Sequence, residues 1–251
     1  MSKTPIAILS ALAEEQHGLI ELLKQPLKVT HAGRDFWQGD LHGQSVFLAL
    51  SKIGKVAAAT TATVVIERFG AGAIVFTGVA GGLGAGVAVG DVVVATDFVQ
   101  HDMDASPLFS RYEVPLYGKT RFTADAALTA LLFKAAEAAL GSGRESQIFA
   151  GAKVHQGLVA SGDRFVSGAQ EAEGLRLALA SAGHAVLAVE MEGAAVAQVC
   201  HDYGIAFAAV RTVSDRADDS AHVDFSRFVN QVASRYALEI IQGFVNLLLI
   251  K

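Results

Sequence analysis

The sequence predicts one α/β domain over residues 1–251, with a twisted, mostly parallel or mixed β-sheet and helices on both of its faces. Short apolar runs alternate with longer helical patterns, which is typical of βαβ units. Hydrophobic residues make up 52% of the chain and charged residues 18%, a composition that suits a large buried core. A length of 251 residues fits one such domain, and no internal repeat or linker divides it.

Each predicted element follows from the pattern of apolar residues. A run that is apolar throughout, such as "AIVFTG" at 73–78, is typical of a strand covered on both faces. In chain order we expect strands at 6–10, 46–51, 73–78, 91–100, 157–162, 185–190 and 206–214. We expect helices at 14–25, 54–70, 124–141 with Thr123 as its cap, 168–182, 193–203 and 224–251, and an irregular stretch at 101–121.

Charge and cysteine content argue against several classes of partner. The net charge of −5 and the pI near 5.9 give no electrostatic basis for binding nucleic acid or an anionic membrane. The single cysteine, Cys200, cannot form an internal disulfide, so we expect a reducing, cytoplasmic environment and a packed thiol. The start "MSKTPIAILSALA" resembles a secretory signal, but its apolar run is short and favours a first strand. No apolar run approaches the ~18 residues of a membrane span.

The glycine and histidine motifs do not match known cofactor or metal patterns. "TGVAGGLGAGVAVG" at 77–90 lacks the glycine spacing of a dinucleotide site, and "GKT" at 118–120 has Glu113 where a P-loop needs glycine. Nothing near "HDMD" at 101–104 completes a set of metal ligands. We therefore expect no cofactor and no metal. The glycines of 77–90 indicate either a backbone that passes close to a small ligand or only a tight turn.

Polar residues gather where predicted strands end, which is where α/β sheets bind ligands. Arg211, Ser214 and Asp215 end one strand, and Glu15 follows the first. As helix caps or first-turn acids these carboxylates would be structural, but they are also suited to proton transfer. A further acid pair, Glu190 and Glu192, interrupts the apolar run "AVLAVEMEGAAVAQVC", where an unpaired carboxylate is costly to bury.

Taken together, these segments resemble the nucleoside phosphorylase/hydrolase superfamily. "SALAEE", "SKIGKVAAA", "TGVAGGL", "VGDVVVA", "LVASGDRFV", "AVEMEGAAVAQVCH" and "VRTVSDRAD" occur in its order and approximate spacing, from about Ile6 to Phe228. The chain is most similar to the branch of 5′-methylthioadenosine/S-adenosylhomocysteine nucleosidases. The resemblance implies a nucleoside phosphorylase-like fold and a hydrolase that cleaves the N-glycosidic bond of 5′-substituted adenosines.

The resemblance also implies a role for each matched residue. Glu15 corresponds to the acid that activates water, and Asp215, oriented by Ser214, to the acid that protonates the purine at N7. Glu192 corresponds to the acid that receives the ribose hydroxyls, which leaves a structural partner to be expected for Glu190. The other implied contacts are Arg211 near the water, Met191 on the sugar, Phe165 stacked on adenine, the backbone of Val166 at the purine edge, Ile53 beside the 5′ substituent, Phe225 over the purine and the 5′ side, and Val79 and Gly81 in the glycine segment.

Two segments depart from the family pattern. Val79 stands where many relatives have Ser or Thr, so that one contact to the water or the sugar is missing. The segment 101–118 also diverges; in the family it reaches across a homodimer to cover the neighbour's 5′ group, a role for which Ala105, Leu108 and Pro115 are candidates. The apolar end "FVNLLLIK" suits a dimer interface and suits packing within the subunit equally well.

Two other functions compete with hydrolysis. A phosphorylase of the same fold needs arginines and backbone donors for phosphate, whereas "SALAEE" offers two acids after the first strand. A non-catalytic nucleoside-binding protein would not need an acid at N7. The sequence leaves open which substrate is preferred among methylthioadenosine, adenosylhomocysteine, 5′-deoxyadenosine and aminofutalosine.

Overall fold

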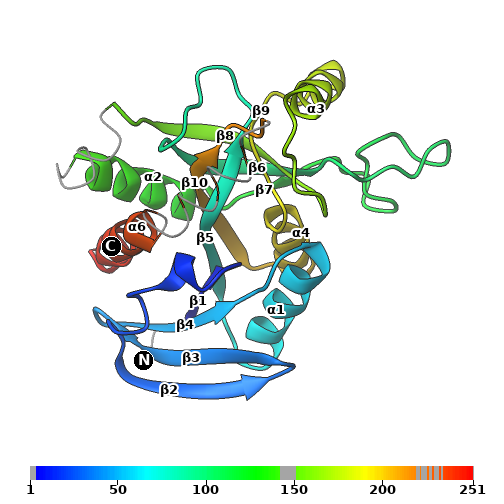
Figure 1. Ribbon diagram of the computed structural model, residues 1–251. Coiled ribbons are helices and arrows are strands. Elements are labelled where there is room, and N and C mark those ends of the chain that lie inside the picture. The colour runs from blue at the N-terminus through cyan, green and yellow to red at the C-terminus, as the bar shows by residue number, and fades with distance from the viewer. Residues whose placement is uncertain are drawn as a thin grey trace.

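The computed structural model describes residues 4–141, 151–218, 221, 225, 228, 232 and 234–250. These residues form a mixed β-sheet with helices on both faces, which confirms the predicted α/β class (Figure 1). The strands are β1 (Ile6–Ser10), β2 (Lys24–His31), β3 (Arg34–Leu41), β4 (Gln44–Leu50), β5 (Ala73–Gly82), β6 (Val92–Gln100), β7 (Phe122–Thr123), β8 (Val154–Ser161), β9 (Val186–Glu190) and β10 (Ala206–Asp215). The helices are the short 3-10 helix η1 (Glu14–Gln16), α1 (Lys55–Glu67), α2 (Ala126–Gly141), α3 (Ala169–Ser181), α4 (Gly193–Tyr203) and α6 (Ser234–Leu249).

The sheet is organised around β5. One edge of β5 pairs in parallel with β10 along nearly its whole length. Its other edge is shared: β1 pairs in parallel with Ala73–Phe76, and β9 pairs antiparallel with Gly81 and Gly82. The pairings β5–β10–β6–β8–β9–β5 close into a ring, and β1, β4, β3 and β2 extend from it. Between Phe76 and Gly81 no described strand pairs with this edge, so the backbone there is available to side chains.

Helices pack against both faces of the sheet. In Figure 1, α1 and α4 lie together on one face, and α2 and α6 lie together on the other. The face under α1 and α4 is closed by small and aromatic side chains, and the face under α2 and α6 by larger aliphatic ones. Since β5 is covered on both sides, its residues are apolar and buried without alternation, as "AIVFTG" predicted. No helix in the described ranges combines the length and the apolarity needed to cross a membrane.

Most predicted elements are present, but the helix predicted at 14–25 is wrong. Only η1 is helical there, and the chain then turns before β2 begins at Lys24. Gly18 has a φ of 88°, outside the helical region, and it interrupts the apolar spacing that suggested a helix. The Glu15 side chain bonds back to the backbone of Ala11 and Leu12, so it points into the protein rather than along a helix surface.

Two smaller predictions also differ from the structure. The β2–β3 hairpin was not expected, because "KQPLKVTH" is exposed at nearly every position and shows no alternation. Thr123 does not cap α2: it lies in β7 and donates to Asp97 Oδ1 at 2.9 Å, whereas Asp125 Oδ1 accepts from Leu128 N at 2.9 Å. The predicted start of the last helix at 224 lies outside the described residues.

Candidate active site

A cavity of ≈ 430 Å³ opens beside the unpaired edge of β5. The carboxyl ends of β1, β5 and β10 and the junction of β9 with α4 meet there, as expected for an α/β sheet. All the residues predicted for the site line this cavity except Arg211 and Val166. The full lining is Ala11, Leu12, Glu15, Ile53, Val79, Ala80, Gly81, Phe165, Val189, Glu190, Met191, Glu192, Ser214, Asp215 and Phe225.

Glu15 occupies the gap in the pairing of β5. Its Oε1 accepts from Val79 N at 3.0 Å, and its Oε2 accepts from Ala11 N at 2.8 Å and from Leu12 N at 2.9 Å. Burial raises the pKa of this carboxyl, while the charge of Arg211 and the three backbone hydrogen bonds act in the opposite direction. The outcome is a buried acid whose pKa lies above its ordinary value, which suits a general base.

Gly78 allows Glu15 and Arg211 to approach the same point on β5. A Cβ atom at this position would lie 2.4 Å from Arg211 Nη1 and 2.8 Å from Glu15 Oε1. Both distances are shorter than real Cβ atoms make, so a side chain here would force the buried Arg211 or Glu15 side chain to move. Of the glycines in segment 77–90, Gly78 therefore provides space for two buried side chains and is not there only to form a turn.

Arg211 lies behind the cavity and is completely buried. Its Nη2 donates to Glu190 Oε2 and lies 3.7 Å from Glu192 Oε2. Its guanidinium carbon is 4.3 Å from the centroid of the Phe76 ring, a cation–π contact. Arg211 therefore interacts with both acids of the pair: it is hydrogen-bonded to Glu190 and forms a longer ion pair with Glu192.

Glu190 has the structural partners expected of it. Besides Arg211, its carboxylate accepts from the Ser161 hydroxyl, from Glu192 N at 3.0 Å and from Gly193 N at 2.8 Å. The last two donors are backbone groups at the start of α4, where a negative charge is favourable. Glu190 thus ties the end of β8, the start of α4 and β10 together beneath the cavity.

Glu192 is buried at the junction of β9 and α4. Its Oε1 accepts from Gly54 N at 2.9 Å. Burial, followed by the charge of Glu190, raises the pKa of Glu192 to about 7, and Arg211 acts in the opposite direction. This carboxyl lines the cavity, and its Oε2 lies 3.7 Å from Arg211 Nη2, beyond hydrogen-bond distance, so it can accept a hydroxyl donor from a ligand.

Asp215 is buried at the end of β10, with both oxygens held in place. Oδ2 accepts from the Ser214 hydroxyl at 2.8 Å, and Oδ1 accepts from Ala217 N at 2.8 Å. A Cβ atom on Gly81 would lie 3.0 Å from Oδ1, so the glycine leaves room for the carboxyl. The hydrogen bond from Ala217 N is the local contact expected of a structural Asp. The carboxyl also lines the cavity, so it can contact a ligand.

The mouth of the cavity is aromatic and apolar. The Phe165 and Phe225 rings meet edge to face, with centroids 5.5 Å apart. Phe165 is 42% exposed and Ile53 is 53% exposed, and because both line the cavity they give its mouth an apolar surface. Val166 is buried in the adjoining apolar cluster and does not line the cavity, so its implied backbone contact stays a prediction.

Sequence reasoning missed two residues that hold the acids. Ser161 bonds to Glu190, and the backbone N–H of Gly54 bonds to Glu192. Ser161 ends a predicted strand, so the rule that selected Ser214 could also have selected it. Gly54 precedes α1 with a φ of 97°, and "SKIGK" gives no local sign that its backbone serves a distant carboxylate.

The other candidates from the sequence have local partners. Asp102 of "HDMD" forms an ion pair with Lys55 at 2.6 Å and accepts from Asp163 N at 2.9 Å. No group of three side chains suited to a metal occurs within the described ranges. Cys200 is buried, and burial raises the pKa of its thiol to about 12, which is typical of an unreactive packed cysteine.

The ring of strands and the acids at its strand ends define a nucleoside phosphorylase-like α/β protein. A family profile described as "Phosphorylase superfamily" matches residues 5–246. The chain is 36% identical over 242 residues to the 5′-methylthioadenosine/S-adenosylhomocysteine nucleosidase of Actinobacillus succinogenes, covering 96% of this chain and 97% of that one.

Solved structures agree with the profile. The 5′-methylthioadenosine/S-adenosylhomocysteine nucleosidase of Neisseria meningitidis in complex with methylthio-immucillin-A superposes with a TM-score of 0.84 at 36% identity, covering 96% of this chain and 98% of that one. The futalosine hydrolase of Helicobacter pylori superposes with a TM-score of 0.83 at 31% identity, covering 97% of each chain. The chain belongs to the phosphorylase superfamily, which confirms the resemblance seen in the sequence.

Proposed function

We propose that the protein hydrolyses the N-glycosidic bond of 5′-substituted adenosines and releases adenine and the 5′-substituted ribose. The observation that carries the proposal is the meeting of three buried carboxylates, Glu15, Asp215 and Glu192, around one cavity with an aromatic mouth. The similarity to methylthioadenosine/adenosylhomocysteine nucleosidases supports the choice of substrate class.

In this proposal Asp215 is the general acid. It gives its proton to N7 of the purine while the bond between C1′ and N9 breaks, so the electron pair leaves with a neutral adenine. Ser214 and Ala217 N fix the orientation of the carboxyl. Phe165 and Phe225 hold the purine plane, and the backbone of Val166 reads its edge.

Glu15 is the general base on the opposite side of the sugar. It takes a proton from water as the water oxygen attacks C1′, and Arg211 helps to hold that water. The raised pKa makes the Glu15 carboxylate a stronger base for this transfer. Val79 contributes only its backbone N–H, which Glu15 already accepts.

Glu192 binds the ribose hydroxyls, and Met191 packs against the sugar. Two hydroxyl donors would give the buried carboxylate the hydrogen bonds that compensate its burial. Ile53 and Phe225 would then lie beside the 5′ substituent, and Gly81 leaves space for Asp215.

Hydrolysis is favoured over phosphorolysis because Glu15 already accepts from the backbone N–H groups that a phosphate would need. A phosphate site would use the N–H groups of Ala11, Leu12 and Val79 at the strand ends, but Glu15 accepts all three. A carboxylate in that position repels phosphate. Water, which is neutral, is not repelled.

A homodimer is part of the proposal, with 101–118 of each subunit near the neighbouring site. Figure 1 shows the segment between β6 and β7 extending away from the sheet. Leu108 and Leu116 in this segment are 84% and 92% exposed, so they would gain from a partner surface. Ala105, Leu108 and Pro115 are the residues proposed to cover the partner's 5′ group.

The test is adenine release from methylthioadenosine, adenosylhomocysteine, 5′-deoxyadenosine and aminofutalosine in phosphate-free buffer. We expect turnover with free 5′-substituted ribose as the second product. The Asp215→Asn variant should lose turnover and still bind substrate in calorimetry. Turnover that requires phosphate and yields a sugar 1-phosphate would identify a phosphorylase instead. Unimpaired turnover by the Asp215→Asn variant would refute the assigned acid.

A further inference from the structure

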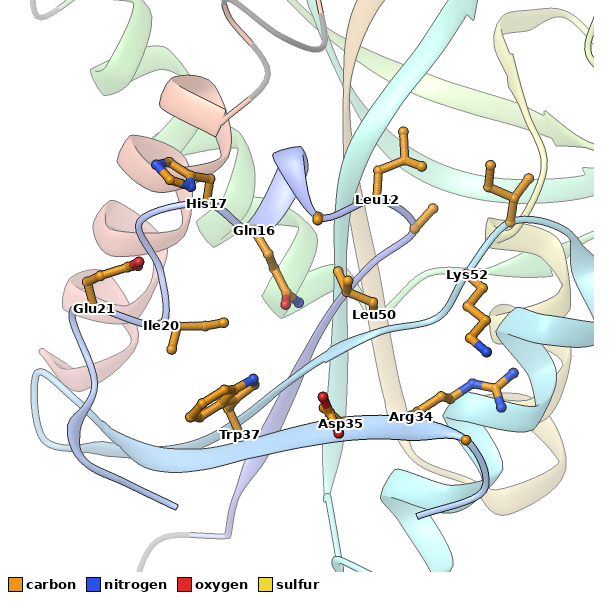
Figure 2. A pocket seen from close by; sticks show the side chains of 14 residues that line it. Leu12, Gln16, His17, Ile20, Glu21, Arg34, Asp35, Trp37, Leu50 and Lys52 are labelled. Carbon is orange, nitrogen blue, oxygen red and sulfur yellow. The ribbon is translucent and has the colours of Figure 1, made fainter. Parts of the chain in front are cut away.

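A second cavity of ≈ 660 Å³ adjoins the candidate active site (Figure 2). It lies between the turn that contains η1, the start of β3 and the end of β4. It shares Ala11, Leu12 and Ile53 with the first cavity, the ≈ 430 Å³ candidate active site, which we call the nucleoside cavity. Because Ile53 is the residue proposed to lie beside the 5′ substituent, the second cavity begins where that substituent would leave the first. It is far larger than a methylthio group needs.

Two cations, Lys52 and Arg34, line the second cavity. Figure 2 shows them on the same side of it, at the end of β4 and the start of β3. Lys52 directly precedes Ile53 in the chain, and Arg34 and Ile53 line a third pocket together. Among the described residues, Arg34 donates to two backbone carbonyls, Ala32 O at 2.9 Å and Ala57 O at 3.2 Å. Within the described residues, neither cation forms an ion pair with a carboxylate.

The acids of the cavity do not neutralise these cations. Asp35 is paired with Lys28 at 2.7 Å and accepts from the Thr30 hydroxyl at 2.6 Å. Glu21 lies on the far side, near His17 (Figure 2).

A third acid, Asp163, lies near Arg34 and Ile53 and accepts from Lys55 N at 2.7 Å. Lys52 and Arg34 are therefore cations of the wall beside Ile53 that no described carboxylate pairs with. An anionic group entering from the nucleoside cavity would meet them first.

The backbone holds Lys52 in an unusual conformation. Its φ is 65°, in the left-handed region that non-glycine residues seldom adopt, and the Ser51 hydroxyl donates to its carbonyl at 2.7 Å. Six other described non-glycine residues also have a positive φ, so the conformation of Lys52 does not by itself mark a ligand site. It fixes the backbone from which the Lys52 side chain extends.

We propose that the second cavity is a subsite for the end of the 5′ substituent, and that Lys52 and Arg34 make it select substituents that carry a carboxylate over the uncharged methylthio group. The inference rests on the proposed nucleosidase function and deepens it. A carboxylate ends both the amino-acid tail of adenosylhomocysteine and the carboxyaryl tail of aminofutalosine. The guanidinium and ammonium groups would bind it through charge-assisted hydrogen bonds.

The test compares the Lys52→Met variant with the wild type in kcat/KM for methylthioadenosine, adenosylhomocysteine and aminofutalosine. We expect a loss of about fivefold with a carboxylate substrate and less than about twofold with methylthioadenosine, since partly exposed charge pairs have modest strength. Adding Arg34→Met should deepen the selective loss. Methylthioadenosine turnover reports whether each variant is folded. Lys134→Met, an exposed lysine on α2 outside both cavities, is the matched control.

The outcomes separate the subsite from the function. A selective loss with adenosylhomocysteine, with aminofutalosine or with both supports the subsite and identifies the tail that it takes. Equal changes for all three substrates, or none, overturn it. Binding of the same ligands to the Asp215→Asn variant, with and without Lys52→Met, gives a second readout without turnover. If the wild type cleaves none of the substrates but Lys52→Met still weakens carboxylate ligands selectively, the nucleosidase proposal fails and the subsite stands.

Discussion

Glu15 and Glu190 are both buried carboxylates beside the same cavity, but they are held in different ways. Glu15 follows β1 and accepts from three backbone N–H groups, with no direct ion pair among the described residues. Glu190 ends β9 and is bonded to the Arg211 guanidinium, a hydroxyl and the start of α4. The hydrogen bonds of Glu15 come from neutral donors, with Arg211 acting on it through its charge, whereas Glu190 is bonded directly to that cation.

The difference indicates a division of labour. Neutral donors fix the position of Glu15 without cancelling its charge, and burial raises its pKa, so it can exchange a proton. The ion pair of Glu190 fixes three elements of the fold, and releasing it would leave Arg211 charged and buried. We therefore expect changes at Glu15 to act mainly on activity and changes at Glu190 to act mainly on stability.

The largest expected effect is on the turnover of the Glu15→Gln variant. Losing the base should lower kcat by about 10² to 10⁴-fold, the usual contribution of general base catalysis. The free energy of unfolding should change less than in the Glu190 variant below, because no buried cation loses its partner. Adenine release and urea denaturation measure the two quantities. A variant that keeps wild-type kcat would remove Glu15 from the mechanism.

Glu190→Gln should give the opposite result, with stability reduced by about 3–5 kcal/mol because Arg211 loses its bonded anion. We expect the lower end of this range, since Glu192 Oε2 is already 3.7 Å from Arg211 and can ionise to replace Glu190. Denaturant titration measures the loss. Glu173→Gln on the exposed face of α3 is the control and should show no measurable change. Equal stabilities of the two variants would contradict a structural role for Glu190.

Gly78→Ala tests the point where the two systems meet. The added methyl group would overlap Arg211 Nη1 and Glu15 Oε1, so we expect a loss of stability of about 1–3 kcal/mol together with at least about tenfold lower kcat. Gly174→Ala, where nothing lies within 4 Å of the added atom on helix α3, should instead leave activity unchanged and stabilise slightly. Wild-type behaviour of Gly78→Ala would show that the backbone can relax there.

The last prediction concerns pH. The pKa of Glu192 is about 7 in the folded protein and 4.5 ordinarily, so the folded state binds more protons between these values. The free energy of unfolding should therefore fall as pH rises from about 4.5 to 7, by about 2–3 kcal/mol from this group. In the Glu192→Gln variant the free energy of unfolding should fall less over this pH range. The fall that remains would come from Glu15, whose pKa is also raised. Identical pH profiles would mean that Glu192 titrates normally.

The sequence predicted the parallel core and most of the cavity because both depend on local patterns. Apolar runs gave the strands, and polar residues at strand ends gave Glu15, Ser214 and Asp215. Arg211 was selected for a different reason from the one that the structure reveals. Its ion pair with Glu190 joins β10 to β9, and a contact across 21 positions leaves no trace in either segment's periodicity.

The second cavity could not be predicted, because it depends on elements that were missed. Arg34 and Trp37 line it from β3, whose side chains are mostly half-buried or buried and whose sequence has little apolar alternation to reveal a strand. The helix wrongly predicted at 14–25 also hid the opposite wall of this cavity, which is formed by the turn that contains η1. Its apolar residues Leu19 and Leu23 are buried, as a helix pattern requires, but Gly18 bends the chain into a turn.

The shared edge of β5 also has a consequence for how the protein acquires activity. Its neighbours come from residues 6–9, 188–189 and 206–215, so the three partners of one strand are distributed over almost the entire chain. Such long-range pairing is slow to form. Glu15 can accept from Val79 N only when β1 and β10 flank β5. Recovery of adenine release during refolding would therefore report the assembly of distant chain segments rather than local secondary structure.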